Sequence, residues 1–213
     1  MLRQRFISIE GPDGSGKSTV VKQLGQRLQE RGLDPLLTRE PGGSPIAEQI
    51  REVILHTGNT AMDIRTETLL YAAARRQHLS ETILPALEAG RLVITDRYVD
   101  SSLAYQGAAR DIPMELVWQI NQFAIEDFLP SLTLLIDVPS QIGLERIHQA
   151  RGQRQYDRLD QEDLSFHQAS RQAFLDLAKQ AADRFVVIDG CQPIEQVVDD
   201  CLDTLAYRQI IDK

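Results

Sequence analysis

A glycine-rich segment near the N-terminus constrains this chain of 213 residues more than any other feature. Residues 11–18 read G-P-D-G-S-G-K-S and directly follow the apolar segment F-I-S-I-E at 6–10. The spacing G-x-x-x-x-G-K-[ST] is that of a phosphate-binding loop, which connects a strand to a helix. The pattern predicts a buried strand over 6–10, a phosphate-binding loop, and a helix from about Ser18 to Arg31.

The chemistry of phosphate binding explains the residue types in this loop. Glycines tolerate positive φ angles and let backbone N–H groups approach phosphate oxygens. Lys17 is placed to neutralise the β- and γ-phosphates, and the Ser18 hydroxyl is placed to hold Mg²⁺. We therefore predict that the donor nucleotide contacts the whole loop: Gly11, Pro12, Asp13, Gly14, Ser15, Gly16, Lys17 and Ser18.

Short apolar segments alternate with helical patterns along the rest of the chain. Further strands are predicted at 35–38, 92–95, 132–137 and 185–188. Helices are predicted at 45–55 (with Ser44 as N-cap and Pro45 first), 64–79, 80–89, from near 101, and at 113–127, 140–150, 164–182 and 193–207. This alternation indicates an α/β fold whose five-stranded parallel sheet carries helices on both faces.

Composition excludes some classes of function. The formal net charge is −8, which disfavours broad binding to nucleic acid or to an anionic membrane. No segment is long and apolar enough for a transmembrane helix, and the N-terminus lacks a signal peptide. Cys191 and Cys201 match no zinc or redox spacing and are expected as free thiols. We expect a cytoplasmic protein with no nucleic-acid or membrane partner.

Charged side chains follow the predicted strands. Arg39 ends the second strand, and Asp96 and Arg97 follow the third. The carboxyl ends of parallel strands form the ligand-binding edge of such a sheet. Two arginines at this edge suit a second phosphorylated molecule, as a nucleoside monophosphate kinase requires. Asp96 is expected either to hold Mg²⁺ or to pair with Arg97 or Lys17.

Several segments together resemble the thymidylate kinase family. They are residues 6–19, T-R-E-P-G-G at 38–43, L-L-Y-A-A-A-R at 69–75, D-R-Y-V-D-S-S-L-A-Y-Q-G at 96–107 and the arginine-rich stretch 146–158. The resemblance implies a P-loop kinase fold in one domain over 1–213, a mobile lid at about 150–163, ATP and dTMP as substrates with Mg²⁺, and a homodimer. The helices at 45–55, 64–79 and 113–127 are candidates for its interface, although their apolar faces could equally be core.

The resemblance also implies roles for residues of a dTMP site. Arg39 and Arg97 would bind the monophosphate, with Asp13 orienting Arg97. Tyr71 would stack on the base and Arg75 would bind its edge. The resemblance suggests a cis Glu40-Pro41 bond and places four further residues around the base and sugar: Ser101, Ser102, Tyr105 and Gln106.

Transition-state stabilisation needs further positive charge near the transferring group. Some members of the family carry a basic residue inside the phosphate loop, but that position is Gly14 here. The resemblance therefore assigns this role to the lid, with Arg154 and Arg158 catalytic and Arg151 at the ATP. Arg146 is expected on the adenine side or as a lid anchor.

Two other classes of function remain open at this point. One is a deoxynucleoside kinase, or a kinase of another monophosphate, on the same scaffold. The other is a regulatory nucleotide switch, although the chain lacks the N-K-x-D segment of guanine-specific switches. A nucleoside acceptor has no phosphate for Arg39 and Arg97 to bind. The choice of acceptor therefore distinguishes a deoxynucleoside kinase from a kinase of nucleoside monophosphates.

Overall fold

A computed structural model describes residues 2–150, 158–159 and 162–212. Within them the strands form one parallel sheet in the order β2-β3-β1-β4-β5. The strands are β1 (Phe6–Glu10), β2 (Leu36–Arg39), β3 (Val93–Asp96), β4 (Leu132–Asp137) and β5 (Phe185–Asp189). Ile7 at the centre pairs with Ile94 of β3 and Leu132 of β4. The predicted parallel sheet is confirmed, with each strand close to its expected range.

Helices connect successive strands. They are α1 (Lys17–Glu30), α2 (Pro45–Leu55), α3 (Ile64–His78), α4 (Leu84–Glu88), α5 (Val99–Ser102), α6 (Met114–Ile125), α7 (Ser140–Gln149), α8 (Leu164–Gln180) and α9 (Ile194–Tyr207). The 3-10 turn η1 (Leu2–Arg5) precedes β1, and η2 (Leu79–Ile83) and η3 (Leu103–Ala109) are π-helical. No described helix is both long and apolar enough to cross a membrane.

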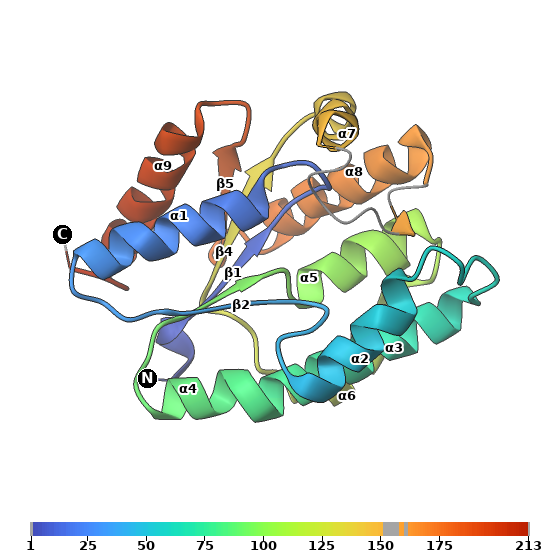
Figure 1. The fold of residues 1–213 in the computed structure, drawn as a ribbon, viewed down its shortest axis with the longest axis horizontal. Coiled ribbons are helices and arrows are strands. Elements are labelled where there is room, and N and C mark those ends of the chain that lie inside the picture. The colour runs from blue at the N-terminus through green and yellow to red at the C-terminus, as the bar shows by residue number, and fades with distance from the viewer. Residues whose placement is uncertain (1, 151–157, 160–161, 213) are drawn as a thin grey trace.

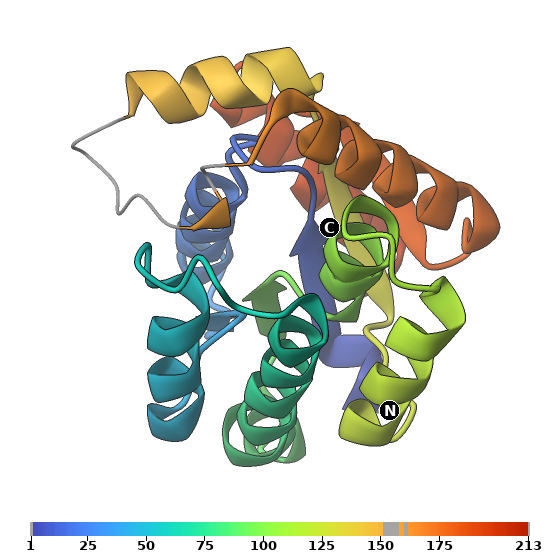
Figure 2. The same ribbon diagram turned by 90° about the vertical axis from the view of Figure 1, so that its right-hand side faces the viewer.

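Apolar side chains fill both sides of the sheet, because its central strands alternate buried residues toward each face. On one face α1 and α9 lie side by side (Figure 1), with Leu24 and Val198 packed on Ile9 and Leu134. The other face carries α3 to α6, η3 and α8, whose apolar residues pack on Phe6 and on the neighbouring strands. In Figure 2, α7 and α8 lie across the top of the molecule, above α2 and α3.

One local expectation was wrong, and two others differ in detail. The helices predicted at 64–79 and 80–89 are continuous, because the π-helical segment η2 joins α3 to α4 without a break. The helix expected from near 101 begins at Val99. Ser44 is the N-cap residue and Pro45 begins α2, as expected, but the Ser44 hydroxyl makes no capping hydrogen bond. Instead, the backbone N–H of Gly43 donates to Glu48 at 2.7 Å.

Candidate active site

The phosphate-binding loop has the backbone that its glycines allow. Gly11, Gly14 and Gly16 have φ angles of 147°, 75° and 89°, and Gly16 immediately precedes α1. A Cβ added at Gly16 would meet no protein atom within 4 Å, so the front of the loop is open. An open loop at a helix N-terminus is the geometry that binds phosphate.

Lys17 lies folded back on this loop. Its ammonium group donates to the carbonyl oxygens of Gly11 at 2.9 Å and Pro12 at 2.8 Å, and contacts the Ser15 hydroxyl at 3.3 Å. Burial and the nearby charge of Arg97 lower the pKa of Lys17 to about 8. A bound polyphosphate would supply the negative charge that this buried ammonium lacks.

Ser18, in the first turn of α1, meets Asp96 at the end of β3. The Ser18 hydroxyl donates to Asp96 Oδ2 at 2.6 Å. Thus Asp96 pairs with Ser18 here, rather than with Lys17 or Arg97. The described residues contain no group of three or more histidine, cysteine and acidic side chains that could cage a metal. One hydroxyl and one carboxylate fit Mg²⁺ that takes its other ligands from water and nucleotide phosphates.

Arg97 lies at the junction of the loop and the rest of the site. Its backbone is left-handed, with φ of 73°, a conformation that non-glycine residues adopt mainly where the surroundings enforce it. Its guanidinium donates to Asp13 at 2.5 Å, to the Gly11 carbonyl at 3.2 Å and to Ser101 at 3.1 Å, and lies over the Tyr105 ring. The expected contact between Asp13 and Arg97 is present.

Asp13 also faces a buried histidine. Its Oδ2 lies 3.9 Å from His167 Nδ1, and Asp13 Oδ2 and His167 Nε2 are both buried without a hydrogen bond among the described residues. Burial raises the pKa of Asp13, but the positive charges of Arg97 and Lys17 outweigh it and lower the pKa below its ordinary value. Asp13 is therefore a carboxylate with one oxygen bound to Arg97 and the other close to His167.

The phosphate loop packs directly on α7. A Cβ at Gly14 would overlap the backbone of Gly143, and one at Gly143 would overlap the Asp13 carbonyl oxygen. Gly14 also has a positive φ, which strains a larger residue. A side chain at this position would therefore require the loop and α7 to move apart in this protein, and here the loop carries Lys17 as its one basic residue.

Two more arginines border the cavity from β2 and α2. Arg39 donates twice to Glu48, at 2.8 and 3.0 Å, while remaining partly exposed. Arg51 donates to the Pro41 carbonyl at 2.7 Å. The Glu40-Pro41 bond is cis, as expected.

Arg75 is almost fully buried and firmly held. Its Nε donates to Glu40 at 2.7 Å, its Nη1 to Ser102 at 2.9 Å and to Asn121, and its Nη2 to the Tyr98 carbonyl at 3.0 Å. A guanidinium has five N–H groups, so these bonds leave one for a ligand. The pairing with Glu40 balances its charge in a buried position.

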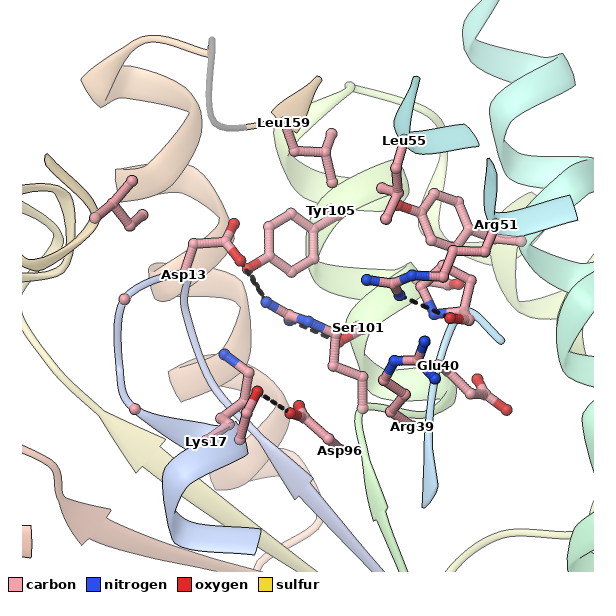
Figure 3. Close-up of a pocket in the computed structure, with 18 of the residues that line it drawn as sticks. Asp13, Lys17, Arg39, Glu40, Arg51, Leu55, Asp96, Ser101, Tyr105 and Leu159 are labelled. Atoms are coloured by element: carbon pink, nitrogen blue, oxygen red, sulfur yellow. Dashed lines mark hydrogen bonds and ion pairs between the residues drawn. The ribbon is translucent and has the colours of Figure 1, made fainter. Parts of the chain in front are cut away.

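These residues surround one cavity of about 530 Å³. Figure 3 shows Asp13 and Lys17 on one side of it and Arg51 and Leu55 on the opposite side, with Ser101 between. The cavity also brings together most of the other predicted site residues: Gly14, Gly16, Ser18, Arg39, Tyr71, Arg75, Asp96, Arg97, Ser102, Tyr105, Gln106 and Arg146. Gly11, Pro12 and Ser15 complete the loop behind it.

The structure describes only one of the three arginines predicted in the lid. Arg151 and Arg154 lie outside the described residues. Arg158 is buried next to Leu55, which lines the cavity, and donates to Glu67 and to the Ile54 carbonyl at 3.1 Å. Its role toward the transferring phosphate stays a prediction. Arg146, at the end of α7, lines the cavity and donates to the Gly190 carbonyl at 3.1 Å.

Sequence reasoning missed several residues of this region. Arg51 and Leu55 line the cavity one helical turn apart, a spacing that the α2 pattern already contained. Glu10 is fully buried and accepts from Ser101 at 2.6 Å and from the Tyr98 N–H at 2.7 Å. Nothing in the sequence signalled Glu10, because its partners lie far away in the chain.

Comparisons with known proteins identify the family of this chain. A family profile described as thymidylate kinase matches residues 9–201. A thymidylate kinase of Latilactobacillus sakei is 57% identical over 97% of this chain and 96% of its own length, and one of Geobacillus sp. is 55% identical over 92% and 93%. A crystal structure of the Ehrlichia chaffeensis thymidylate kinase has a TM-score of 0.76 and 32% identity, covering 94% of this chain and 97% of that one. The chain belongs to the thymidylate kinase family.

Proposed function

We infer that this protein transfers the γ-phosphoryl group of ATP to dTMP, giving ADP and dTDP. The observation that carries this is the single cavity that joins an open phosphate loop to an arginine-lined end. A P–O bond forms to a phosphate oxygen of dTMP as the bond to the β-phosphate of ATP breaks. Such a transfer needs two polyanions held in line, with their charge neutralised.

We assign the donor side to the loop. The backbone N–H groups of the loop at 11–18 and Lys17 bind the ATP phosphates, Arg146 contacts the adenine side or anchors the lid, and Arg151 contacts ATP from the lid. Ser18 and Asp96 hold Mg²⁺, directly or through water. When bound, the ion neutralises charge on the β- and γ-phosphates.

We assign the acceptor side to the rest of the cavity. Arg39 and Arg97 bind the dTMP phosphate, and Asp13 keeps the Arg97 guanidinium in place, a role supported by their 2.5 Å contact. Tyr71 stacks on thymine, and the remaining N–H of Arg75 donates to the base edge. The other residues line the base and sugar: Ser101, Ser102, Tyr105 and Gln106.

We propose that Lys17, Asp13, Arg97 and the lid arginines Arg154 and Arg158 stabilise the transition state. An arginine over the transferring group is worth a large factor in turnover. The absence of room for a side chain at Gly14 supports this assignment, because the loop itself supplies only Lys17.

We propose a cytoplasmic homodimer that associates through α2, α3 and α6. Support comes from exposed apolar side chains on two adjacent helices, Leu69 on α3 and Leu116 and Phe123 on α6, with Phe123 89% exposed. Large exposed apolar side chains that gather on one face mark interaction surfaces. Sedimentation analysis of the wild type and of Phe123→Ser tests this, and a monomeric wild type would contradict it.

The activity is tested by coupled ADP release with ATP, Mg²⁺ and a panel of acceptors: dTMP, dUMP, dCMP, dGMP, UMP and thymidine. We expect fast turnover with dTMP, slower turnover with dUMP and none with thymidine. Turnover with thymidine but not dTMP would indicate a nucleoside kinase and contradict the roles of Arg39 and Arg97. Tight nucleotide binding without turnover of any acceptor would indicate a switch.

A further inference from the structure

Gln106 faces the acceptor end of the cavity from η3. Its side chain is buried and lines the cavity, and its Nε2 donates to Glu67 Oε1 at 2.9 Å. A glutamine amide has one end that donates and one that accepts, so its orientation decides what it offers to a ligand. No described residue donates to Gln106 Oε1. The amide therefore has its acceptor end available on the side of the cavity.

Glu67 on α3 makes this orientation obligatory. It is only 1% exposed, and two arginines converge on it: Arg158, and Arg110 at 3.3 Å. Burial raises the pKa of Glu67, but hydrogen bonds from Arg158 and Gln106 and the charge of Arg110 outweigh it, so the pKa lies below its ordinary value. An ionised carboxylate can only accept hydrogen bonds. A reversed Gln106 amide would place two acceptors against each other.

Arg75 supplies the opposite property. Four of its five N–H groups are bound to protein, and the guanidinium lines the same cavity. Because a guanidinium has no acceptor, its remaining N–H group can only donate to a ligand. The base end of the cavity thus offers a donor from Arg75 and an acceptor from Gln106.

We propose that Glu67 is a positioning residue that sets the hydrogen-bonding polarity of the base site by fixing the Gln106 amide. The inference rests on the proposed function. Thymine offers a 4-oxo group that accepts and an N3–H group that donates, which complements Arg75 and Gln106. Cytosine offers a 4-amino group that donates and an N3 that accepts, so it mismatches both. Buried polar groups left unpaired make such discrimination strong.

The test compares kcat/KM for dTMP and for 5-methyl-dCMP. The two bases differ only in the group at position 4 and in the hydrogen on N3, which are the positions expected to contact Arg75 and Gln106. In Glu67→Gln the neutral amide can donate as well as accept, so Gln106 can reverse. We expect the preference for dTMP to fall about tenfold, the worth of roughly one hydrogen bond. Glu162→Gln is the matched control, because Glu162 also pairs with Arg110, at 2.6 Å, and has no hydrogen bond to Gln106 among the described contacts.

A merely structural role for Glu67 would lower kcat/KM for both substrates equally and leave the preference unchanged, which would overturn the proposal. An equal change in Glu162→Gln would also overturn it. Gln106→Met keeps the ion pairs of Glu67, so it tests the proposal even if Glu67→Gln fails to fold. We expect this variant to lose the preference for dTMP over 5-methyl-dCMP. A preference equal to that of the wild type would refute the inference. In the Gln106→Met background, Glu67→Gln should change the preference no further. Failure of the proposed function is distinct, because the wild type would then not phosphorylate dTMP.

Discussion

The close packing of the phosphate loop on α7 gives a sharp prediction for Gly143→Ala. An added Cβ would overlap the carbonyl oxygen of Asp13, whereas ordinary contact begins at 3.4 Å. The loop and helix must therefore separate by about 1 Å, and displacements of that size at a reacting centre can cost about 100-fold in rate. Overpacking lowers the free energy of unfolding by about 1–3 kcal/mol, whereas replacing a helical glycine with alanine raises it by about 1 kcal/mol. We therefore expect a net loss of stability of up to about 2 kcal/mol.

Gly25→Ala in α1 is the matched control. It is the same substitution in a helix, but the added Cβ would meet the end of the half-buried Leu37 side chain, which can rotate away. We expect Gly143→Ala to lower kcat by one to two orders of magnitude in a coupled ADP-release assay, with a lower melting temperature. We expect Gly25→Ala to keep wild-type turnover. Wild-type kcat and ATP KM in Gly143→Ala would refute the reasoning.

Three further predictions use other parts of the site. Arg97→Ala should weaken dTMP binding by about 10- to 100-fold in calorimetric titration, because a phosphate loses a charge-assisted partner; unchanged affinity would contradict the assignment. Ser18→Ala should raise the Mg²⁺ concentration for half-maximal activity without changing the KM for dTMP; an unchanged Mg²⁺ requirement would count against the metal site. Burial and the Asp100 carboxylate raise the pKa of Glu10 to about 8, so the folded state keeps a proton that the unfolded state releases near its ordinary pKa of about 4.3. The free energy of unfolding measured in urea should therefore fall as pH rises from about 5 to 8, by at most about 1.4 kcal/mol per pH unit. Glu10→Gln should flatten that slope. An equally steep slope in the variant would contradict the role of Glu10 in the pH dependence.

The sequence was most informative where function depends on local spacing. The helical pair Tyr71 and Arg75 was identified only through the family resemblance. The phosphate loop and the strand ends at Arg39 and Arg97 could be located from residues adjacent in the chain. Their placement around one cavity follows from the parallel sheet, since its strands all end at the same edge.

Features set by long-range contacts could not be predicted in this way. Glu10 meets Ser101, and Glu67 meets Arg158, each across about 90 residues of chain. The π-helical junction at η2 escaped prediction because Ser80 is a residue type common at helix N-termini, so a new helix was expected to begin there. Ser44 has the sequence of a helix cap, yet its hydroxyl is buried without a partner while Glu48 binds the neighbouring N–H group.

The two ends of the cavity are made from different kinds of structure. The end proposed for phosphate is formed by the loop and strand termini of β1, β2 and β3, whereas the end proposed for the base includes side chains on α3 and η3. If the proposed roles hold, replacing residues on those two helical segments should alter which base fits while the rim of the sheet keeps its shape. Evolution, or a protein engineer, can therefore retune the choice of nucleobase independently of the phosphate chemistry, and we expect natural variation in base preference to concentrate on α3 and η3.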